Sequence, residues 1–242
     1  MKITIKHPKK STDHIINNIE VPTNNYNIKF SNTIDLYNND KPTNVLILGS
    51  GYMGKSSLLM YLVEKYFGSK NHICTLYTNS SHIDHYKDHK HLIIRNKFNH
   101  YDSDSIESMK YINSKTKNKY NFVNIFDDII DTKHKEVLDK CFLYYRNSNL
   151  TTILSTQYKN LVEPRARTNV QSVCFFGFND QKAIEGVIEE WLDSYFQDIL
   201  EDNNIKPTMK EKVRLYNYLT NDHRFIYLVP CKRHIEFIKL KL

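Results

Sequence analysis

The sequence predicts an α/β fold in which helices flank a mostly parallel β-sheet, and two observations predict it. From Asn44 onward, apolar runs of strand length alternate with helical stretches, a pattern typical of a parallel sheet covered on both faces. The first of these runs leads directly into a glycine-rich phosphate-binding motif at Gly49–Ser56, and a helical stretch follows it. This order predicts a loop at the carboxyl edge of the sheet, where α/β proteins bind their ligands.

The strands and helices can be placed individually along the chain. The expected strands are Val45–Leu48, Ile73–Tyr77, Leu92–Ile94, Phe122–Phe126, Thr152–Leu154 and Val173–Phe176. The expected helices are Lys55–Phe67, Ser105–Ser114, Lys135–Arg146 and Gln181–Leu200. The last of these carries an apolar stripe, which indicates a face packed on the core; a surface that docks a partner is the alternative. Beyond Pro207 we expect a short helix at Val213–Leu219 and a hairpin of two extended runs, Phe225–Val229 and Ile235–Leu240.

Three segments are expected within the 242 residues. Residues 1–43 are polar and rich in turn-forming Asn and Pro, so we interpret them as an N-terminal lead-in segment. Residues 44–180 are expected to form the P-loop core, and residues 181–242 the C-terminal helices and hairpin packed on that core. A chain of 28.8 kDa is long enough for one large domain with a well-buried core.

The charge of the chain is consistent with a polyanionic partner. It carries 34 Lys and Arg against 27 Asp and Glu, a formal charge of +7, and its pI is near 9.0. An ordinary solvated basic surface is the alternative interpretation. No apolar run approaches the ~20 residues that span a bilayer, and the N-terminal residues lack the apolar stretch of a signal peptide. The protein is therefore expected to be soluble and intracellular, with no membrane-spanning segment.

The spacing of the cysteines and histidines bears on metal binding. The four cysteines are far apart and form no C-x-x-C pair, which favours reduced core thiols: Cys74, Cys141, Cys174 and Cys231. Four histidines crowd one short stretch: His82, His85, His89 and His91. A zinc site is one interpretation of that stretch, but no cysteine joins it and its mixed charge favours an exposed loop.

The phosphate-binding motif matches G-x-x-x-x-G-K-[ST] at every position. Its lysine, Lys55, is expected to neutralise the β- and γ-phosphates of a nucleotide, and the Ser56 hydroxyl to ligate Mg²⁺. The free N–H groups at the start of the following helix favour phosphate as well. The residues expected to line the nucleotide are Gly49, Ser50, Gly51, Tyr52, Met53, Gly54, Lys55, Ser56 and Ser57.

Two acidic residues and one amide at the ends of later strands complete the predicted site. Asp127 and Asp128 follow an apolar strand, so Asp127 is expected to hold Mg²⁺ and Asp128 to polarise the attacking water. Many ATP-hydrolysing P-loop enzymes have Glu at the second position, so Asp128 is a shorter variant. A cap of the next helix is the alternative role for the pair. Gln157 ends another strand and is a candidate sensor of the γ-phosphate, although an exposed polar residue at this place is commonplace.

The order of these motifs, followed by Pro164-Arg165-Ala166-Arg167-Thr168-Asn169, resembles one group of viral enzymes. It is similar to the genome-packaging ATPases of poxviruses, other large DNA viruses and virophages, which belong to the FtsK–HerA superfamily of DNA-pumping motors. The resemblance covers about residues 44–178. Its most specific part is residues 121–178, because a P-loop alone is shared by many activities.

The resemblance implies a RecA-like (ASCE) core with an added strand between the P-loop strand and the Walker B strand, working in a ring that is usually a hexamer. It implies that Lys55 and Ser56 are the P-loop pair, Asp127 the metal acid, Asp128 the catalytic acid and Gln157 the polar sensor.

The resemblance also offers two candidates for an arginine that completes the site of a neighbouring subunit. Arg146 precedes the sensor strand, at a basic position that resembles a trans-acting finger in related motors, and Arg167 lies in the Arg-x-Asn element. In the family the residue after the first arginine is often His or Lys, whereas here it is Asn147. Taken without the family, each arginine is better explained by a surface salt bridge or a DNA-phosphate contact.

The predicted function is ATP-driven translocation of double-stranded DNA into a preformed viral capsid, with ATP and Mg²⁺ as cofactors. The implied partners are double-stranded DNA, further copies of the chain in a ring, and capsid or portal proteins, in the host cytoplasm (a viral factory) or the virion. Residues 110–119 and the surroundings of Lys159 are candidates for the DNA-contacting surface, a solvated basic loop being the alternative.

Two other functions stay open at the level of sequence. The chain could be a P-loop nucleoside or nucleotide kinase, with Arg165 and Arg167 forming a lid over the phosphates. It could also be a non-hydrolysing DNA-binding or capsid protein with a vestigial nucleotide site, although the intact Lys55, Ser56 and Asp127 argue against decay. A GTPase is disfavoured, because the sequence contains no Asn-Lys-x-Asp motif.

Overall fold

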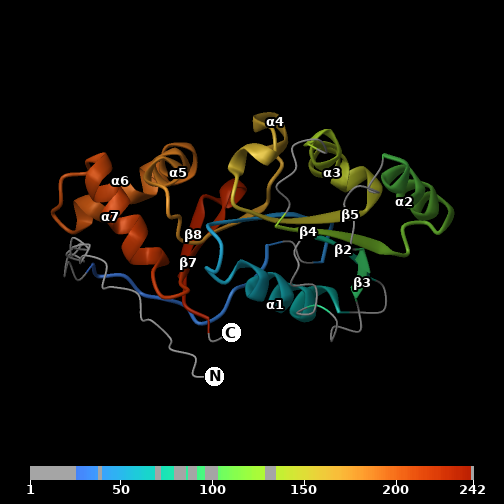
Figure 1. Cartoon of the computed structure of the whole chain (residues 1–242), viewed down its shortest axis with the longest axis horizontal. Coiled ribbons are helices and arrows are strands. Elements are labelled where there is room, and N and C mark those ends of the chain that lie inside the picture. The colour runs from blue at the N-terminus through green and yellow to red at the C-terminus, as the bar shows by residue number, and fades with distance from the viewer. Residues whose placement is uncertain are drawn as a thin grey trace, which may run out of the picture.

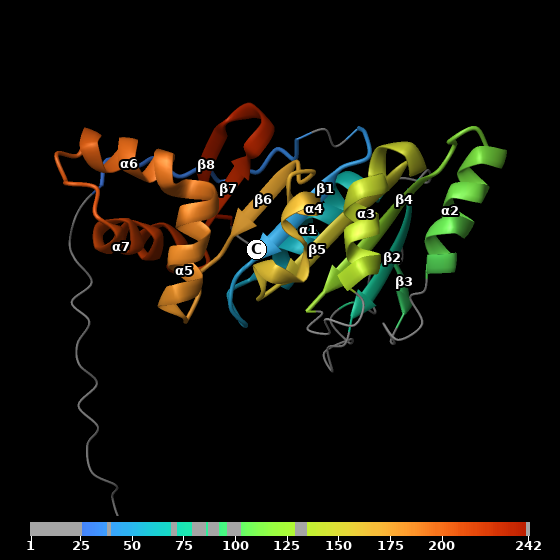
Figure 2. The same cartoon turned by 90° about the horizontal axis from the view of Figure 1, so that it is seen from above.

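The computed structural model of the chain describes residues 26–37, 40–68, 72–78, 86, 92–95, 103–128 and 135–240. Its centre is an eight-stranded sheet with the strand order β3-β2-β4-β5-β1-β6-β7-β8 (Figure 2). The strands are β1 Asn44–Leu48, β2 His72–Thr78, β3 Leu92–Arg95, β4 Asn121–Asp127, β5 Leu150–Thr156, β6 Ser172–Phe175, β7 Phe225–Val229 and β8 His234–Ile238. The first six pair in parallel and the last two antiparallel, which confirms the predicted mostly parallel α/β sheet.

The helices cover both faces of this sheet. They are α1 Lys55–Phe67, α2 Ser103–Lys115, α3 Lys135–Ser148, α4 Pro164–Arg167, α5 Gln181–Val187, α6 Asp193–Asp202 and α7 Met209–Thr220, with short helical turns η4 Lys159–Leu161, η5 Ile188–Leu192 and η6 Pro230–Lys232. Helix α1 lies on one face of the sheet, and α3 and α4 lie on the other (Figure 1). The side chains of the central strands therefore enter two separate apolar cores, one on each face.

The middle of the sheet is the most deeply buried part and places the ends of its strands side by side. Every residue of β1 and β5 is buried, as expected for strands that have neighbours on both edges and helices on both faces. In the register of β1 and β5, Leu48 lies opposite Thr156, and in that of β4 and β5, Asp127 lies opposite Ser155. Strand β5 is thus the strand inserted between the P-loop strand and the strand of Asp127, as the resemblance implied.

The predicted helix 181–200 is not a single regular α-helix, which corrects the sequence interpretation. It begins at α5, where Asp180 caps the first turn by accepting from the backbone N–H groups of Lys182 and Ala183, and continues through a π-helical turn, η5, into α6. A π turn adds a residue to the helix and is frequent at functional or strained positions. Here it contains Glu190, which forms ion pairs with Arg167 and Lys159.

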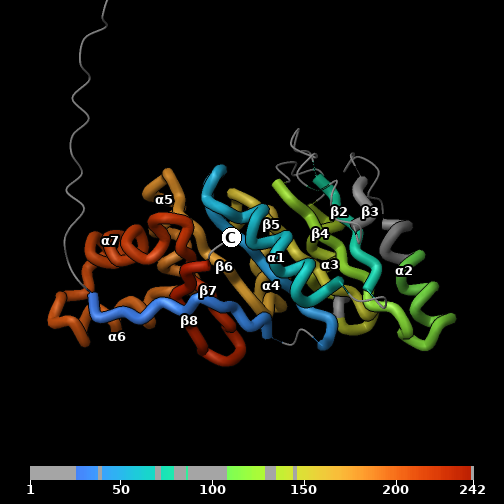
Figure 3. Tube along the Cα trace, turned by 90° about the horizontal axis from the view of Figure 1, so that it is seen from below, coloured from blue at the N-terminus to red at the C-terminus, as the bar shows by residue number. Residues whose placement is uncertain are grey.

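The two ends of the described chain meet at the outer edge of the sheet. The predicted hairpin is present as β7 and β8, and Ser31 from the N-terminal segment forms a parallel bridge with Ile238 of β8. Figure 3 shows residues 26–37 passing β8 after leaving the neighbourhood of α6. Helix α7 begins earlier than expected, at Met209, because Thr208 caps it by accepting from the Glu211 N–H. Within the described residues, no helix is both long and apolar enough to cross a bilayer.

Candidate nucleotide-binding site

The phosphate-binding loop follows β1 and is fastened to the ends of its two neighbouring strands. The Gly49 N–H donates to the Thr156 carbonyl at 3.3 Å, and the Ser50 N–H donates to the Gly177 carbonyl at 2.9 Å. A Cβ on Gly49 would come within 2.6 Å of the Phe176 Cβ, so only glycine fits between these segments. Gly54 has φ +97°, a left-handed conformation that also favours glycine. The loop conformation is therefore built into the junction of β1, β5 and β6.

The P-loop lysine lies across its own loop and close to both acids. Lys55 is buried, and its Nζ donates to the Ser50 carbonyl at 2.7 Å. Burial lowers the pKa of Lys55, while the charges of Asp128 and Asp127 act in the opposite direction. A polyphosphate placed in the loop would bring this buried cation further negative charge, which is the role expected from the sequence.

Ser56 and Asp127 form the pair that fits a magnesium ion. The Ser56 Oγ donates to Asp127 Oδ2 at 3.0 Å, and Asp127 is only 2 % exposed. Its other oxygen, Oδ1, is buried and has no hydrogen-bond partner among the described residues. A buried carboxylate oxygen without a partner is costly unless a cation or a metal-bound water meets it. The residues present therefore fit the expected metal site.

A second donor to Asp127 was not found from the sequence. The Tyr86 hydroxyl also hydrogen-bonds to Asp127 Oδ2. Burial and the charge of Asp127 raise the pKa of Tyr86, so this hydroxyl stays protonated as a donor. Tyr86 belongs to no motif and follows β2 in a stretch rich in His and Lys, and no local pattern connects it with the acid after β4.

Asp128 and Gln157 are also in contact, across the ends of β4 and β5. The Gln157 Nε2 donates to Asp128 Oδ1 at 3.3 Å and lies 3.9 Å from the place of a Cβ on Gly51. Asp128 leaves its strand in a left-handed conformation, φ 52°, and its N–H donates to the Ser155 carbonyl at 3.0 Å. The proposed catalytic acid and the proposed sensor therefore meet next to the phosphate-binding loop.

The other residues of the motif lie around this centre. Tyr52 is 95 % exposed at the tip of the loop and adopts φ 62°, which is unusual for an aromatic residue. Met53 turns inward, with its sulfur 3.5 Å from the place of a Cβ on Gly177, and Ser57 is exposed on the first turn of α1. Sequence reasoning missed His223, whose Nδ1 lies 3.7 Å from the place of a Cβ on Gly54. It belongs to the turn between α7 and β7, so no sequence motif connects it with the loop.

The two candidate arginines have different environments. Arg167 is 8 % exposed; its Nε donates to Glu190 Oε1 at 2.6 Å, and its Nη1 to the carbonyls of Val162 and Lys159 at 2.6 and 3.3 Å. These contacts bind α4 to the π-helical turn within one chain. The cation of Arg167 therefore has a structural partner inside the subunit.

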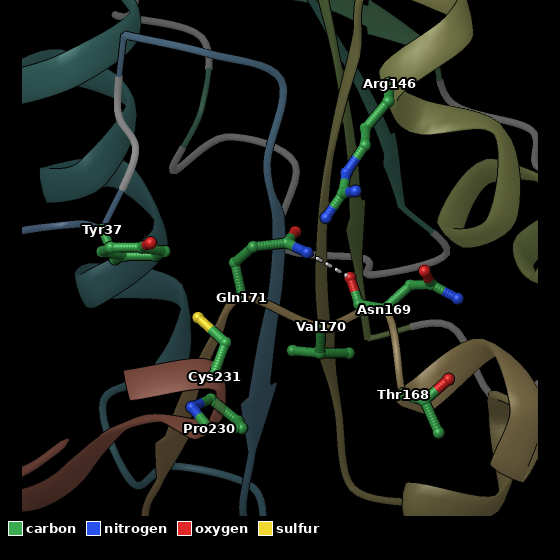
Figure 4. A pocket seen from close by; sticks show the side chains of 8 residues that line it. All are labelled: Tyr37, Arg146, Thr168, Asn169, Val170, Gln171, Pro230 and Cys231. Carbon is green, nitrogen blue, oxygen red and sulfur yellow. Dashed lines mark hydrogen bonds between the residues drawn. The ribbon is translucent and has the colours of Figure 1, made fainter. Parts of the chain in front are cut away.

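Arg146 is exposed at the amino edge of the sheet, opposite the edge that carries the phosphate-binding loop. It lies near the end of α3, just before β5 begins, and contributes to a pocket of about 450 Å³ together with Tyr37, Thr168, Asn169, Val170, Gln171, Pro230 and Cys231. Figure 4 shows its guanidinium extending toward Gln171 and Asn169. Strand β5 has 7 residues, at about 3.3 Å each, so roughly 20 Å separate this edge from the P-loop edge. Arg146 cannot reach the P-loop of its own chain.

The sequence also offered a zinc site at four histidines and predicted four core thiols. His82, His85, His89 and His91 lie outside the described residues. Cys74, Cys141 and Cys174 are buried thiols outside any disulfide, as expected, and burial raises the pKa of Cys74 to about 12. Cys231 is exposed, which corrects its interpretation as a core thiol: it follows the end of β7 and lines the Arg146 pocket.

Solved structures with the same architecture include genome-packaging enzymes of two Sulfolobus turreted icosahedral viruses. The DNA-packaging ATPase B204 of Sulfolobus turreted icosahedral virus aligns with a TM-score of 0.53 and 14 % identity, over 84 % of this chain and 100 % of B204. The chain has the fold of this packaging ATPase. The genome-packaging NTPase B204 of Sulfolobus turreted icosahedral virus 2, in complex with sulfate, aligns with a TM-score of 0.53 and 15 % identity, over 84 % of this chain and 98 % of that one.

The likeness to the packaging ATPase fold extends beyond the P-loop core. The B204 enzyme of the second virus in complex with AMP aligns with a TM-score of 0.51 and 14 % identity, again over 84 % of this chain and 98 % of that one. No protein-family model and no curated protein sequence matches the chain. The predicted resemblance to viral packaging ATPases is thus confirmed in the RecA-like fold.

Proposed function

We propose that the chain is an ATPase that pumps double-stranded DNA into a preformed viral capsid. The observation that carries the proposal is the meeting of Lys55, the Ser56–Asp127 pair and the Asp128–Gln157 pair at one edge of a packaging-ATPase fold. Each group has the chemistry that one step of ATP hydrolysis requires. Shared fold alone would not support a function, so the side-chain arrangement is the argument.

In this proposal the residues of the P-loop edge divide the work of binding and hydrolysis. Lys55 and the N–H groups at the start of α1 bind the phosphates, and Ser56 with Asp127 holds Mg²⁺. When bound, Mg²⁺ neutralises the charge on the β- and γ-phosphates. Asp128 accepts a proton from the attacking water, and Gln157, already bonded to Asp128, contacts the γ-phosphate or that water.

The position of Arg146 supports a ring of subunits. It is exposed and lies on the edge opposite the P-loop, so the nucleotide it serves is that of a neighbouring subunit. We favour it over Arg167 as the trans-acting finger, because Arg167 would have to leave its partly buried ion pair with Glu190 and its hydrogen bonds to two carbonyls. A hexamer is the ring we propose, by resemblance to related motors.

The remaining parts of the proposal concern DNA and location. The DNA surface is proposed at residues 110–119, whose lysines flank the exposed Tyr111. Lys159 is a weaker candidate, since it donates to the Gly186 carbonyl at 2.7 Å and to Glu190 at 3.0 Å.

Capsid or portal proteins are the proposed further partners, and the viral factory in the host cytoplasm or the virion is the proposed location. We propose that the chain is divided into a lead-in segment at residues 1–43, the ATPase core at 44–180, and the C-terminal helices and hairpin at 181–242.

ATP hydrolysis measured with and without double-stranded DNA tests the proposal. We expect DNA to stimulate the wild-type rate. The stimulation should weaken as the salt concentration rises, because the protein contacts the backbone phosphates without reading the base sequence. We expect no stimulation in Lys55→Ala, which lacks the phosphate-binding cation. Phosphate transfer to a nucleoside would identify a kinase instead. Nucleotide binding without any turnover would identify a non-hydrolysing protein, and either result would overturn the proposal.

A further inference from the structure

The structure connects one residue outside the sequence motifs with the metal site. Tyr86 is 2 % exposed, and its hydroxyl donates to Asp127 Oδ2, the same oxygen that accepts from Ser56 Oγ at 3.0 Å. The three side chains therefore form one cluster, contributed by α1, by β4 and by the chain after β2.

The two carboxylate oxygens of Asp127 have different hydrogen-bond partners in this cluster. Oδ2 accepts from two hydroxyls, whereas the buried Oδ1 has no partner among the residues that the structure describes. Two donors on one oxygen restrict rotation of the carboxylate and leave the other oxygen available. Hydrogen bonds of this kind orient metal-binding carboxylates in proteins, and their loss typically lowers metal affinity about 10–100-fold.

A role in packing alone does not account for the hydroxyl. The Tyr86 ring belongs to the apolar core beneath the sheet, together with side chains of α1. Phenylalanine would fill that core equally well. A buried hydroxyl placed on the metal acid is the part that packing leaves unexplained.

We propose that Tyr86 is a positioning residue of the magnesium site. Its hydroxyl holds the Asp127 carboxylate so that the buried Oδ1 would stay available to an Mg²⁺ ion or its bound water. This inference rests on the proposed function, since it requires a site for ATP with Mg²⁺, and it names a determinant of metal affinity that lies outside the P-loop and the strand of Asp127.

The test is Tyr86→Phe, which removes the hydroxyl and keeps the ring. The affinity for ATP is measured by calorimetry in EDTA and in Mg²⁺, and the affinity of the protein–ATP complex for Mn²⁺ by electron paramagnetic resonance. We expect metal affinity to fall about tenfold and ATP affinity in EDTA to stay unchanged. In an Asp127→Ala background, Tyr86→Phe should have no further effect, because the two residues act through one contact.

Tyr227→Phe is the matched control. It removes a buried hydroxyl that lies 3.1 Å from Ser172 Oγ and donates to the Asp35 carbonyl at 3.0 Å, and thermal unfolding is measured for both variants. Unchanged metal affinity in Tyr86→Phe would overturn the positioning role. So would an equal loss of ATP affinity with and without metal, which indicates damage to the fold. A wild-type protein that binds no ATP with Mg²⁺ would instead refute the proposed function, and the positioning role with it.

Discussion

The groups around the phosphate-binding loop and those that line the Arg146 pocket differ in how their polar side chains are satisfied. At the carboxyl edge, Ser56 donates to Asp127 and Gln157 donates to Asp128, yet Asp127 Oδ1 has no partner in the described part of the chain. At the amino edge, the wall of the Arg146 pocket is satisfied internally. The Gln171 amide accepts from the Asn44 N–H and donates to the Asn169 carbonyl, both at 2.7 Å.

The difference shows that one chain carries two unlike parts of the proposed site, facing away from each other. The carboxyl edge has the groups that we propose bind phosphates and activate water, and the amino edge has an exposed arginine beside the hydrogen-bonded Gln171. About 20 Å of β5 lies between them. In the proposed ring, the arginine edge of one subunit meets the phosphate edge of the next, so hydrolysis depends on assembly.

The largest expected effect is the loss of ATP hydrolysis when the arginine at the amino edge is removed. Arg146→Ala should lower ATP hydrolysis on the order of 10³-fold, because an arginine finger stabilises the charge of the transition state. Thermal unfolding should not change, since the side chain is exposed. Hydrolysis by Arg146→Ala subunits mixed with Asp128→Asn subunits should recover in part, because an intact acid and an intact arginine then meet at some interfaces. Absence of recovery would place the catalytic arginine at Arg167 or confine the effect to one subunit.

The next prediction concerns the carboxyl edge alone. Asp128→Asn should lower single-turnover hydrolysis about 10²-fold or more, because the amide cannot accept a proton. ATP affinity, measured by calorimetry, should stay close to wild type, since Asn can still accept from Gln157. The matched control is Asp198→Asn, an exposed position on α6. A comparable loss in the control, or a loss of binding equal to the loss of rate, would contradict the role of Asp128.

A third prediction tests the structural role of Arg167 through the stability of the protein. Arg167→Ala should lower the free energy of unfolding by about 3 kcal/mol, because it leaves the carboxylate of Glu190 with a single cationic partner and two carbonyls without a donor. Urea denaturation followed by circular dichroism measures this. Arg165→Ala, whose side chain is 72 % exposed, is the control and should cause little change. Equal stability of the two variants would refute the structural role of Arg167.

The smallest expected effect is at the tip of the phosphate-binding loop. Tyr52 adopts φ 62°, so Tyr52→Gly should relieve strain and raise the free energy of unfolding by about 1 kcal/mol or less. Tyr158→Gly is the contrast, because Tyr158 is also exposed but extended, with φ −121°, and its replacement should be destabilising. If both substitutions change stability in the same direction, backbone strain at Tyr52 is not the reason.

Much of the carboxyl edge could be predicted from the sequence because its signals are local. The P-loop directly follows a buried strand, and Asp127, Asp128 and Gln157 each stand at the end of an apolar run. Parallel strands bring their carboxyl ends to one edge, so these positions were expected to converge. The place of β5 between β1 and β4 was implied by the resemblance, whereas the rest of the strand order came from the structure.

The contacts made through space could not be predicted in this way. No sequence pattern near Arg167 predicts its ion pair with Glu190. The π-helical turn that contains Glu190 was not predicted either. Arg146 and Arg167 looked equivalent as candidates, and only burial distinguished them. His223 reaches the P-loop from a turn that follows α7.

The sequence by itself determined the fold class, the phosphate-binding loop and the acids that follow it, because periodicity and strand ends are local properties of the chain. The tertiary structure alone decided which arginine is buried, and that Tyr86 and Ser56 share one oxygen of Asp127. Such contacts depend on how separate elements pack, and the free energy of packing joins residues far apart in the sequence.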